Sequence, residues 1–359
     1  MFVTDTFTTP PADDDACPCF WAMIRMTPAS DNIWRIVRRG FAFVSRSGGI
    51  SLMKIRQLWF TSVVALTVMI GPATVFADDV ATATITPLWD GDMPPWDAPA
   101  GEERDASNAK SRKAAGRPVV RLTDVSTPQL YTYHPADGPS DTAVVICPGG
   151  GFSILAWDLE GTEIARYFAR GGVSAAVVKY RVPTRNASVK FRAPVQDARR
   201  AVAMLRSGDG PGGFEPTKIG LLGFSAGGHT VAQSIFNAKS MTDGRDDTVS
   251  VDFGVLVYPA YLLKDDAKIK PPRLADGLTV TKDSPPMFFA HAVDDPYSAI
   301  GSMELMAELM RNDVRSELHV FASGGHGFGG RDNETTSDAW LDLCLNWMID
   351  SGFVAAKQP

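Results

Sequence analysis

Cysteine is scarce in this sequence, with four residues in a chain of 359. So few cysteines exclude the disulfide framework that holds many small secreted domains together. Cys17 and Cys19 stand close together, but no second pair supplies the remaining ligands of a zinc site. Cys147 and Cys344 lie in apolar stretches, where we expect buried free thiols. We expect the protein to use no metal and no cofactor.

Blocks of positive charge are also missing. The formal net charge is −6, and 45% of the residues are hydrophobic and 21% charged, as in an ordinary soluble globular protein. Because no long Lys/Arg run occurs in the part that we expect to be mature, we expect no nucleic-acid partner.

The chain has an apolar stretch, 58–70, that is shorter than the roughly 18 to 20 residues of a membrane-spanning helix. Basic residues precede it and the small-residue sequence Val75-Phe76-Ala77 follows it, which is typical of a secretory signal over 53–77. We expect cleavage after Ala77, a secreted or periplasmic protein, and no stable membrane insertion afterwards. Residues 1–52 then form an upstream extension that is either not native or disordered.

The rest of the chain falls into two parts. Residues 78–119 are rich in Pro, Asp, Ala and Gly and predict an extended lead-in. In 120–355 apolar strand patterns alternate with helical ones, which indicates one mostly parallel sheet covered on both faces. The expected strands are 129–135, 142–150, 173–180, 218–224, 251–260, 286–293 and 316–322, and the expected helices are 160–172, 193–207, 225–238, 299–313 and 336–350. The long insertion 261–286 predicts a small lid.

The stretch "KIGLLGFSAGGH" carries a Gly-x-Ser-x-Gly turn between an expected strand and an expected helix. Its glycines and Ser225 fit an ordinary turn with an N-cap, or a nucleophile on a sharp strand-to-helix elbow. Chance matches to so short a motif are common, so the strand before it and the helix after it favour the nucleophile.

Partners for such a serine are expected at the carboxyl ends of other strands. Asp294 and Asp295 follow one strand, and His326 lies in a glycine-rich loop after the next. His326 would accept the serine proton and a carboxylate would orient the imidazole. Either aspartate is also a common turn residue, and the residues alone leave the choice between them open.

A third strand end carries the triplet Gly149-Gly150-Gly151. It fits a tight turn or a phosphate cradle, but no Gly-Lys-Ser/Thr follows, which argues against a Walker loop. The amides of Gly150 and Gly151, with that of Ala226 after the serine, can instead form an oxyanion hole.

The segments "PGGGF", "GFSAGGH", "HAVDDP" and "GGHGFG", in this order, resemble the α/β-hydrolase superfamily, and most closely its carbohydrate esterases related to acetylxylan and feruloyl esterases. The resemblance covers about 120–355. It implies the α/β-hydrolase fold, and it selects Asp295, four residues after His291, as the acid, with Asp294 in reserve. Many relatives begin the oxyanion loop with His-Gly-Gly, whereas this chain has Pro148.

These observations predict a serine hydrolase, a carboxylic ester hydrolase, acting on a small acyl ester or an acylated polysaccharide. The alternatives are a peptidase of the prolyl oligopeptidase type, a glycosidase, and a binding protein on the same fold that has lost its chemistry. The sequence does not indicate the acyl group, the sugar or the oligomeric state.

Overall fold

The computed structural model describes residues 83–242, 247–264 and 271–355. The expected signal, 53–77, and the extension before it lie outside the described residues. All described residues belong to one compact unit, which spans Pro72–Pro359.

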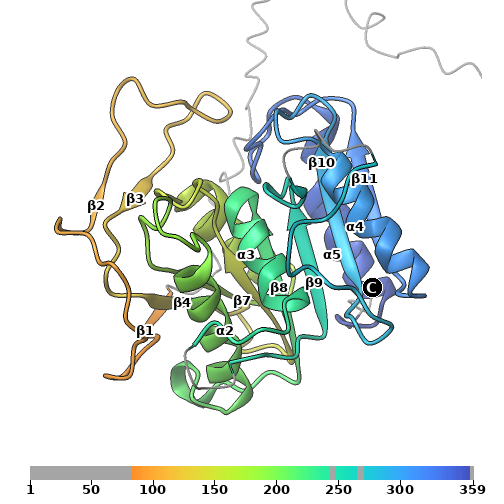
Figure 1. Ribbon diagram of the computed structural model, residues 1–359. Helices are drawn as coiled ribbons and strands as arrows, with labels where there is room; N and C mark the ends of the chain where they lie inside the picture. The colour runs from red at the N-terminus through yellow and green to blue at the C-terminus, as the bar shows by residue number, and fades with distance from the viewer. Residues whose placement is uncertain (1–82, 243–246, 265–270, 356–359) are drawn as a thin grey trace, which may run out of the picture. The chain divides into compact units, whose positions relative to one another are not determined.

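An eight-stranded sheet forms the centre, in the order β1-β4-β7-β5-β8-β9-β10-β11. Pairing is antiparallel between β1 and β4 and between β4 and β7, and parallel in the rest of the sheet. The strands are β1 (Thr84–Pro87), β4 (Gln129–Tyr133), β5 (Thr142–Cys147), β7 (Ser174–Lys179), β8 (Lys218–Phe224), β9 (Phe253–Val257), β10 (Met287–Ala292) and β11 (Glu317–Phe321). The expected mostly parallel sheet is therefore present (Figure 1).

Helices cover both faces of this sheet. Side chains alternate along each strand, so that Val145 of β5 belongs to the apolar cluster that includes residues of α2, α3 and α4, while Val144 belongs to the cluster that includes residues of α1 and α5. Both faces are apolar, which explains the nearly continuous hydrophobic strands in the sequence. The α-helices among the described residues are α1 (Glu163–Arg170), α2 (Arg192–Arg206), α3 (Ser225–Phe236), α4 (Ile300–Arg311) and α5 (Trp340–Asp350). Cys147 and Cys344 are buried and free, one on each side of the sheet.

The segment before residue 120 belongs to the folded unit. Strand β1 extends the main sheet, and β2 (Arg104–Asp105) lies beside β3 (Arg121–Thr123) (Figure 1). Strand β3 also pairs with β6 (Leu155–Ala156), so that β2, β3 and β6 form a small second sheet. The expected boundary between lead-in and domain therefore falls inside the folded unit. Residues before it have no periodic pattern of their own, but strands that are distant in the sequence pair with them and hold them in place.

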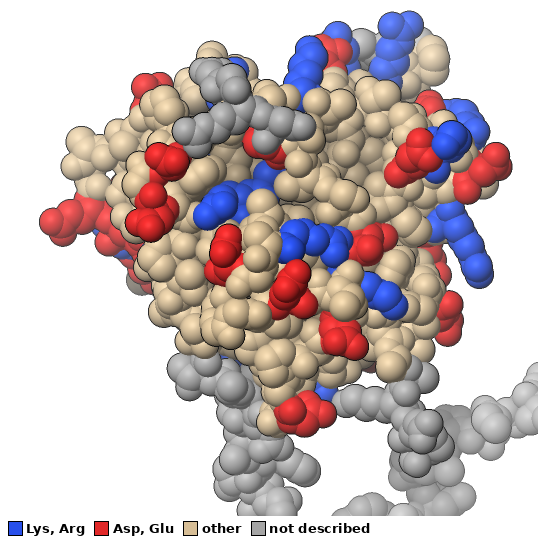
Figure 2. Space-filling view, turned by 90° about the horizontal axis from the view of Figure 1, so that it is seen from below, with Lys and Arg blue, Asp and Glu red and all other residues tan. Residues whose placement is uncertain are grey.

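Two further observations concern the described residues. None of their helices combines the length and hydropathy needed to cross a membrane. On the face seen from below, acidic and basic side chains are interspersed over a larger uncharged area (Figure 2).

Candidate active site

Ser225 stands where β8 ends and α3 begins, on a sharp turn. Its φ is 50°, a left-handed value that non-glycine residues rarely adopt. The neighbouring glycines allow close packing: a Cβ on Gly223 would lie 2.3 Å from the Gly227 oxygen, and one on Gly227 would lie 2.1 Å from the Cys147 oxygen. Ser225 is the first residue of α3 and not its N-cap, which is Phe224. The glycine motif thus serves a strained elbow that presents the serine side chain.

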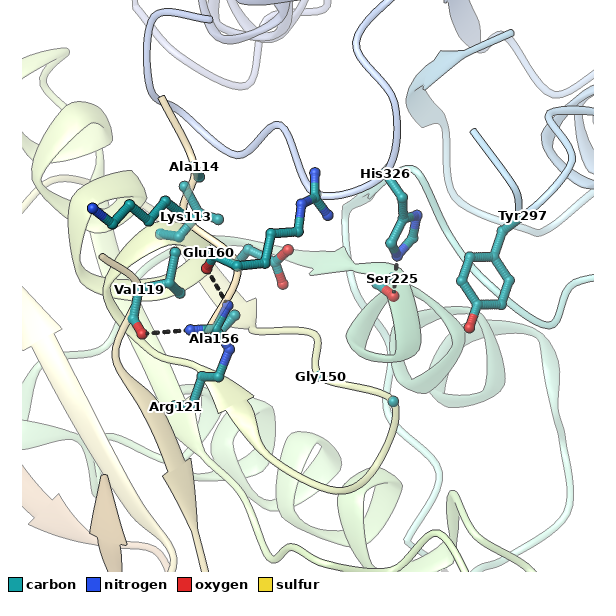
Figure 3. Close-up of a pocket in the computed structure, with 14 residues that line it drawn as sticks. Lys113, Ala114, Val119, Arg121, Gly150, Ala156, Glu160, Ser225, Tyr297 and His326 are labelled. Carbon is teal, nitrogen blue, oxygen red and sulfur yellow. Dashed lines mark hydrogen bonds between the residues drawn. The ribbon is translucent and has the colours of Figure 1, made fainter. Parts of the chain in front are cut away.

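The Ser225 hydroxyl points at His326, which lies in the loop after β11 (Figure 3). Ser225 Oγ is 2.8 Å from His326 Nε2, and His326 Nδ1 is 2.7 Å from Asp295 Oδ2. A carboxylate oxygen only accepts, so Nδ1 carries the proton and Nε2 accepts from the serine hydroxyl. This is the arrangement in which an imidazole can act as a general base.

Asp295 is held in its ionised form by donors on several sides. Burial opposes ionisation, but hydrogen bonds from His291 and His326 and the backbone N–H of Tyr297 outweigh it and lower the pKa of Asp295. The Tyr297 N–H donates to Oδ1 at 2.7 Å, and His291 Nε2 lies 3.4 Å from Oδ2. The fixed carboxylate can orient the His326 ring and stabilise its charged form.

Asp294, the reserve candidate, points elsewhere. Its Oδ1 accepts from the Gly325 N–H at 2.7 Å, and its Oδ2 lies 3.4 Å from the Gly324 N. Asp294 therefore braces the loop that carries His326, while Asp295 contacts the imidazole itself.

The glycine triplet lies beside the serine. Gly150 has a φ of 137° and Gly151 one of 63°, and a Cβ on Gly150 would lie 2.0 Å from the Ile154 oxygen. Both glycines line the cleft that holds Ser225. The N–H of Ala226 is in the first turn of α3, where helical N–H groups have no partner within the helix.

The anchoring of this loop involves Glu160, which the sequence analysis did not single out. The Gly149 N–H donates to Glu160 Oε2 at 2.7 Å, and the Tyr258 hydroxyl donates to Oε1 at 3.0 Å. Tyr258 in turn accepts from the Gly329 N–H at 3.1 Å, just beyond His326. Glu160 and Tyr258 thus join the glycine loop to the histidine loop.

Burial raises the pKa of Glu160, although the hydrogen bonds from Gly149 and Tyr258 and the electrostatic influence of His326 and Arg112 act in the opposite direction. No sequence pattern marks this residue, because its partners come from distant segments. Glu160 is a buried carboxylate in the short π-helix Asp158–Thr162, which directly precedes α1.

The cleft has a volume of about 230 Å³ and two walls. We call Gly150, Gly151, Ser225 and His326 the strand-end wall, and residues 112–121 the N-terminal wall; Figure 3 shows Ser225 and His326 on one side and Lys113, Ala114, Val119 and Arg121 on the other. The described residues of 261–286 do not line this cleft. The lid expected at 261–286 stays a prediction. The N-terminal wall of the cleft comes mostly from the expected lead-in, 78–119.

The described residues contain no group of three or more His, Cys, Asp or Glu side chains that could hold a metal ion.

Comparison with known proteins gives a consistent result. A family described as having the alpha/beta hydrolase fold matches residues 144–300. An acetylxylan esterase of Xylanibacter ruminicola is 25% identical over 251 residues, which cover 64% of this chain and 50% of the relative. An endo-1,4-beta-xylanase B of Butyrivibrio fibrisolvens is 24% identical, over 58% of this chain and 35% of the relative. The chain thus spans half or less of the length of these curated relatives.

Among solved structures, an acetyl ester-xyloside bifunctional hydrolase from Caldicellulosiruptor lactoaceticus is 25% identical with a TM-score of 0.56, covering 76% of this chain and 97% of that one. A thermophilic esterase from Thermogutta terrifontis, with butyrate bound, is 25% identical with a TM-score of 0.53, covering 66% and 93%.

The chain has the α/β-hydrolase fold, as predicted. Its predicted resemblance to carbohydrate esterases is confirmed, and relatives and solved structures named as esterases support the predicted class of enzyme, a serine hydrolase.

Proposed function

We propose that this protein is an exported serine esterase that removes acetyl or other small acyl groups from a carbohydrate such as xylan. The observation that carries the proposal is the continuous line from Ser225 Oγ through His326 to Asp295, with spacings of 2.8 and 2.7 Å. Relatives named as an acetylxylan esterase and an acetyl ester-xyloside hydrolase support the substrate class.

The reaction follows from this line of contacts. Ser225 Oγ attacks the ester carbonyl carbon while its proton passes to His326 Nε2. The oxyanion that forms is stabilised by the amides of Gly150, Gly151 and Ala226. Collapse breaks the bond to the alcohol, which takes the proton from His326, and an acyl-serine remains. Water then attacks the acyl group, again with His326 as base, and releases the acid and free Ser225.

The size of the cleft supports a small acyl group. Its volume of about 230 Å³ lies below the roughly 300 to 1,000 Å³ of pockets for drug-sized ligands. Leu159, Ala156 and Val119 supply apolar lining beside Glu160 and Arg112.

The test is hydrolysis of acetylated xylan, methyl ferulate and a peptide amide by the chain from Asp78 onward, with Ser225→Ala as the matched control. Release of acetate that depends on Ser225 supports the proposal. Cleavage of the amide alone would favour the peptidase, and a folded protein that neither turns over an ester nor reacts with a fluorophosphonate at Ser225 would be the binding protein.

Export is part of the proposal and has its own test. Expression in a bacterial host followed by N-terminal sequencing of the exported protein should give a chain that begins at Asp78. An exported chain that retains residues 1–52 would contradict it.

A further inference from the structure

A second and larger cavity lies behind the glycine loop. Its volume is about 690 Å³, within the usual range of ligand-binding cavities. Its lining comes from three segments, around Trp96, at Ser153, and along 183–196. None of these residues takes part in the proposed chemistry.

The two cavities are lined by neighbouring residues of one loop. Gly150 and Gly151 line the catalytic cleft, and Ser153, two residues further on, lines the second cavity. The Phe152 carbonyl between them accepts from the backbone N–H groups of Thr184 and Arg185, at 2.8 and 3.0 Å. A ligand in the second cavity therefore lies one loop away from the serine.

The Trp96 ring is held in this cavity by a cation–π contact with a buried arginine. The guanidinium carbon of Arg181 lies 5.6 Å from the centre of the Trp96 ring and 5.9 Å from that of Trp89. Arg181 is fully buried, pairs with Asp197, and donates to the Pro94 carbonyl at 2.9 Å. A charge so fixed holds the indole in place, and the half-buried ring contributes its remaining surface to the cavity.

The other lining groups are mostly polar and exposed. They include the amide of Asn186, the hydroxyl of Ser188, the carboxylate of Asp97 and the guanidinium of Arg185. A fixed aromatic surface with hydroxyl-binding groups around it suits a sugar ring, which has an apolar face and a rim of hydroxyls.

We propose that this second cavity binds the unsubstituted sugar units of the polysaccharide, so that an ester on a neighbouring unit reaches Ser225. The choice of xylan as the polysaccharide rests on the proposed function. The cavity then makes the enzyme selective for esters on oligosaccharides over small free esters, because only the former can occupy both cavities.

Binding is tested without turnover. Isothermal titration of Ser225→Ala with xylohexaose, which carries no ester, should show binding that weakens at least 10-fold when Trp96→Ala is added. Trp96→Phe keeps an aromatic face and should stay within about threefold. Asn186→Ala, an exposed change, gives a second variant if Trp96→Ala does not fold. Lys110→Ala, exposed and outside both cavities, is the control and should have no effect.

Kinetics separate this proposal from the esterase proposal. In the otherwise unchanged enzyme, Trp96→Ala should lower kcat/KM on acetylated xylo-oligosaccharides at least 10-fold, mainly through KM, and change kcat/KM on p-nitrophenyl acetate less than twofold. If the enzyme is an active esterase and its folded Trp96→Ala and Asn186→Ala variants keep full activity on oligosaccharides, the proposal of sugar binding in the second cavity is wrong and the esterase proposal stands. If xylohexaose binding depends on Trp96 but the protein hydrolyses no ester, the proposal of sugar binding in the second cavity stands and the esterase proposal is wrong.

Discussion

The two walls of the catalytic cleft are held in place by different means. The strand-end wall consists of residues at the ends of buried parallel strands, where short turns leave little freedom. The N-terminal wall has only short backbone pairings among the described residues, those of β2 with β3, of β3 with β6 and of Ala114 with Arg117, and side chains also hold it in place. Arg121 donates to the Arg112 carbonyl at 2.6 Å, and Arg331 donates to the Pro118 carbonyl at 2.8 Å. The residues of the proposed chemistry thus lie on rigid backbone in the strand-end wall. The N-terminal wall, on the other side of the cleft, consists of loops that side-chain hydrogen bonds hold in place.

The comparison predicts that the strand-end wall determines turnover. Ser225→Ala and His326→Ala should each lower kcat by about 10⁵- to 10⁶-fold, and the double variant should lose little more, because such residues act as a unit. The measurement is steady-state hydrolysis of p-nitrophenyl acetate with folding checked by circular dichroism. A double variant whose loss equals the product of the single losses would contradict a joint role.

The neighbouring carboxylates Asp294 and Asp295 form a matched pair. Asp295→Asn should cost about 10⁴-fold in kcat, since the amide no longer fixes the His326 tautomer. Asp294→Asn should cost less than about threefold, because its amide oxygen can still accept from the Gly325 N–H. Reversed costs would exchange the roles of the two residues.

The next largest effect is expected at the glycine loop. Gly150→Val places a branched side chain where even a Cβ would lie 2.0 Å from the Ile154 oxygen, at a φ of 137°. Displacing one oxyanion donor typically costs about 100- to 1,000-fold in kcat, or roughly 3 to 4 kcal/mol. Pro148→His leaves the donor amides in place and should cost much less. Near-normal turnover in a folded Gly150→Val enzyme would remove this loop from the mechanism.

A smaller loss is expected at Glu160, which positions the loop without contacting the reacting atoms. Glu160→Gln replaces an acceptor of two hydrogen bonds, from the Gly149 N–H and the Tyr258 hydroxyl, with a group that can accept only at one atom. Displacement of the loop should lower kcat by about 10- to 100-fold and leave KM nearly unchanged. Glu215→Gln, an exposed carboxylate, is the control. A rise in KM at constant kcat would assign Glu160 to substrate binding.

The strand-end wall could be predicted from the sequence because its signals are local. Ser225 and Gly150 follow hydrophobic strands, and the parallel order of those strands brings their ends together. All seven expected strands and all five expected helices are present, with ends shifted by a few residues. Glu160 and Trp96 could not be found this way, because each acquires its role from distant partners: Tyr258 for one and Arg181 for the other.

The smallest loss of turnover is expected when the N-terminal wall is released by a change at Arg331. Arg331 is buried, and it donates to the carboxylates of Asp158 and Glu163 and to the Pro118 carbonyl. Arg331→Met leaves these groups without their partner and should lower the free energy of unfolding by about 2 to 3 kcal/mol, less than for a fully buried pair because both carboxylates are partly exposed. At 25 °C the folded variant should lose less than about fivefold in kcat on p-nitrophenyl acetate, since Ser225 and His326 keep their positions.

Arg117→Gln is the matched control: it removes an arginine that pairs with the same Glu163 but is 65% exposed, and it should cost no more than about 1 kcal/mol. Urea unfolding and steady-state kinetics on the same samples check both values. A folded Arg331→Met enzyme with a loss in kcat as large as that of Gly150→Val would show that the N-terminal wall also fixes the reacting groups, and the contrast between the walls would then be wrong.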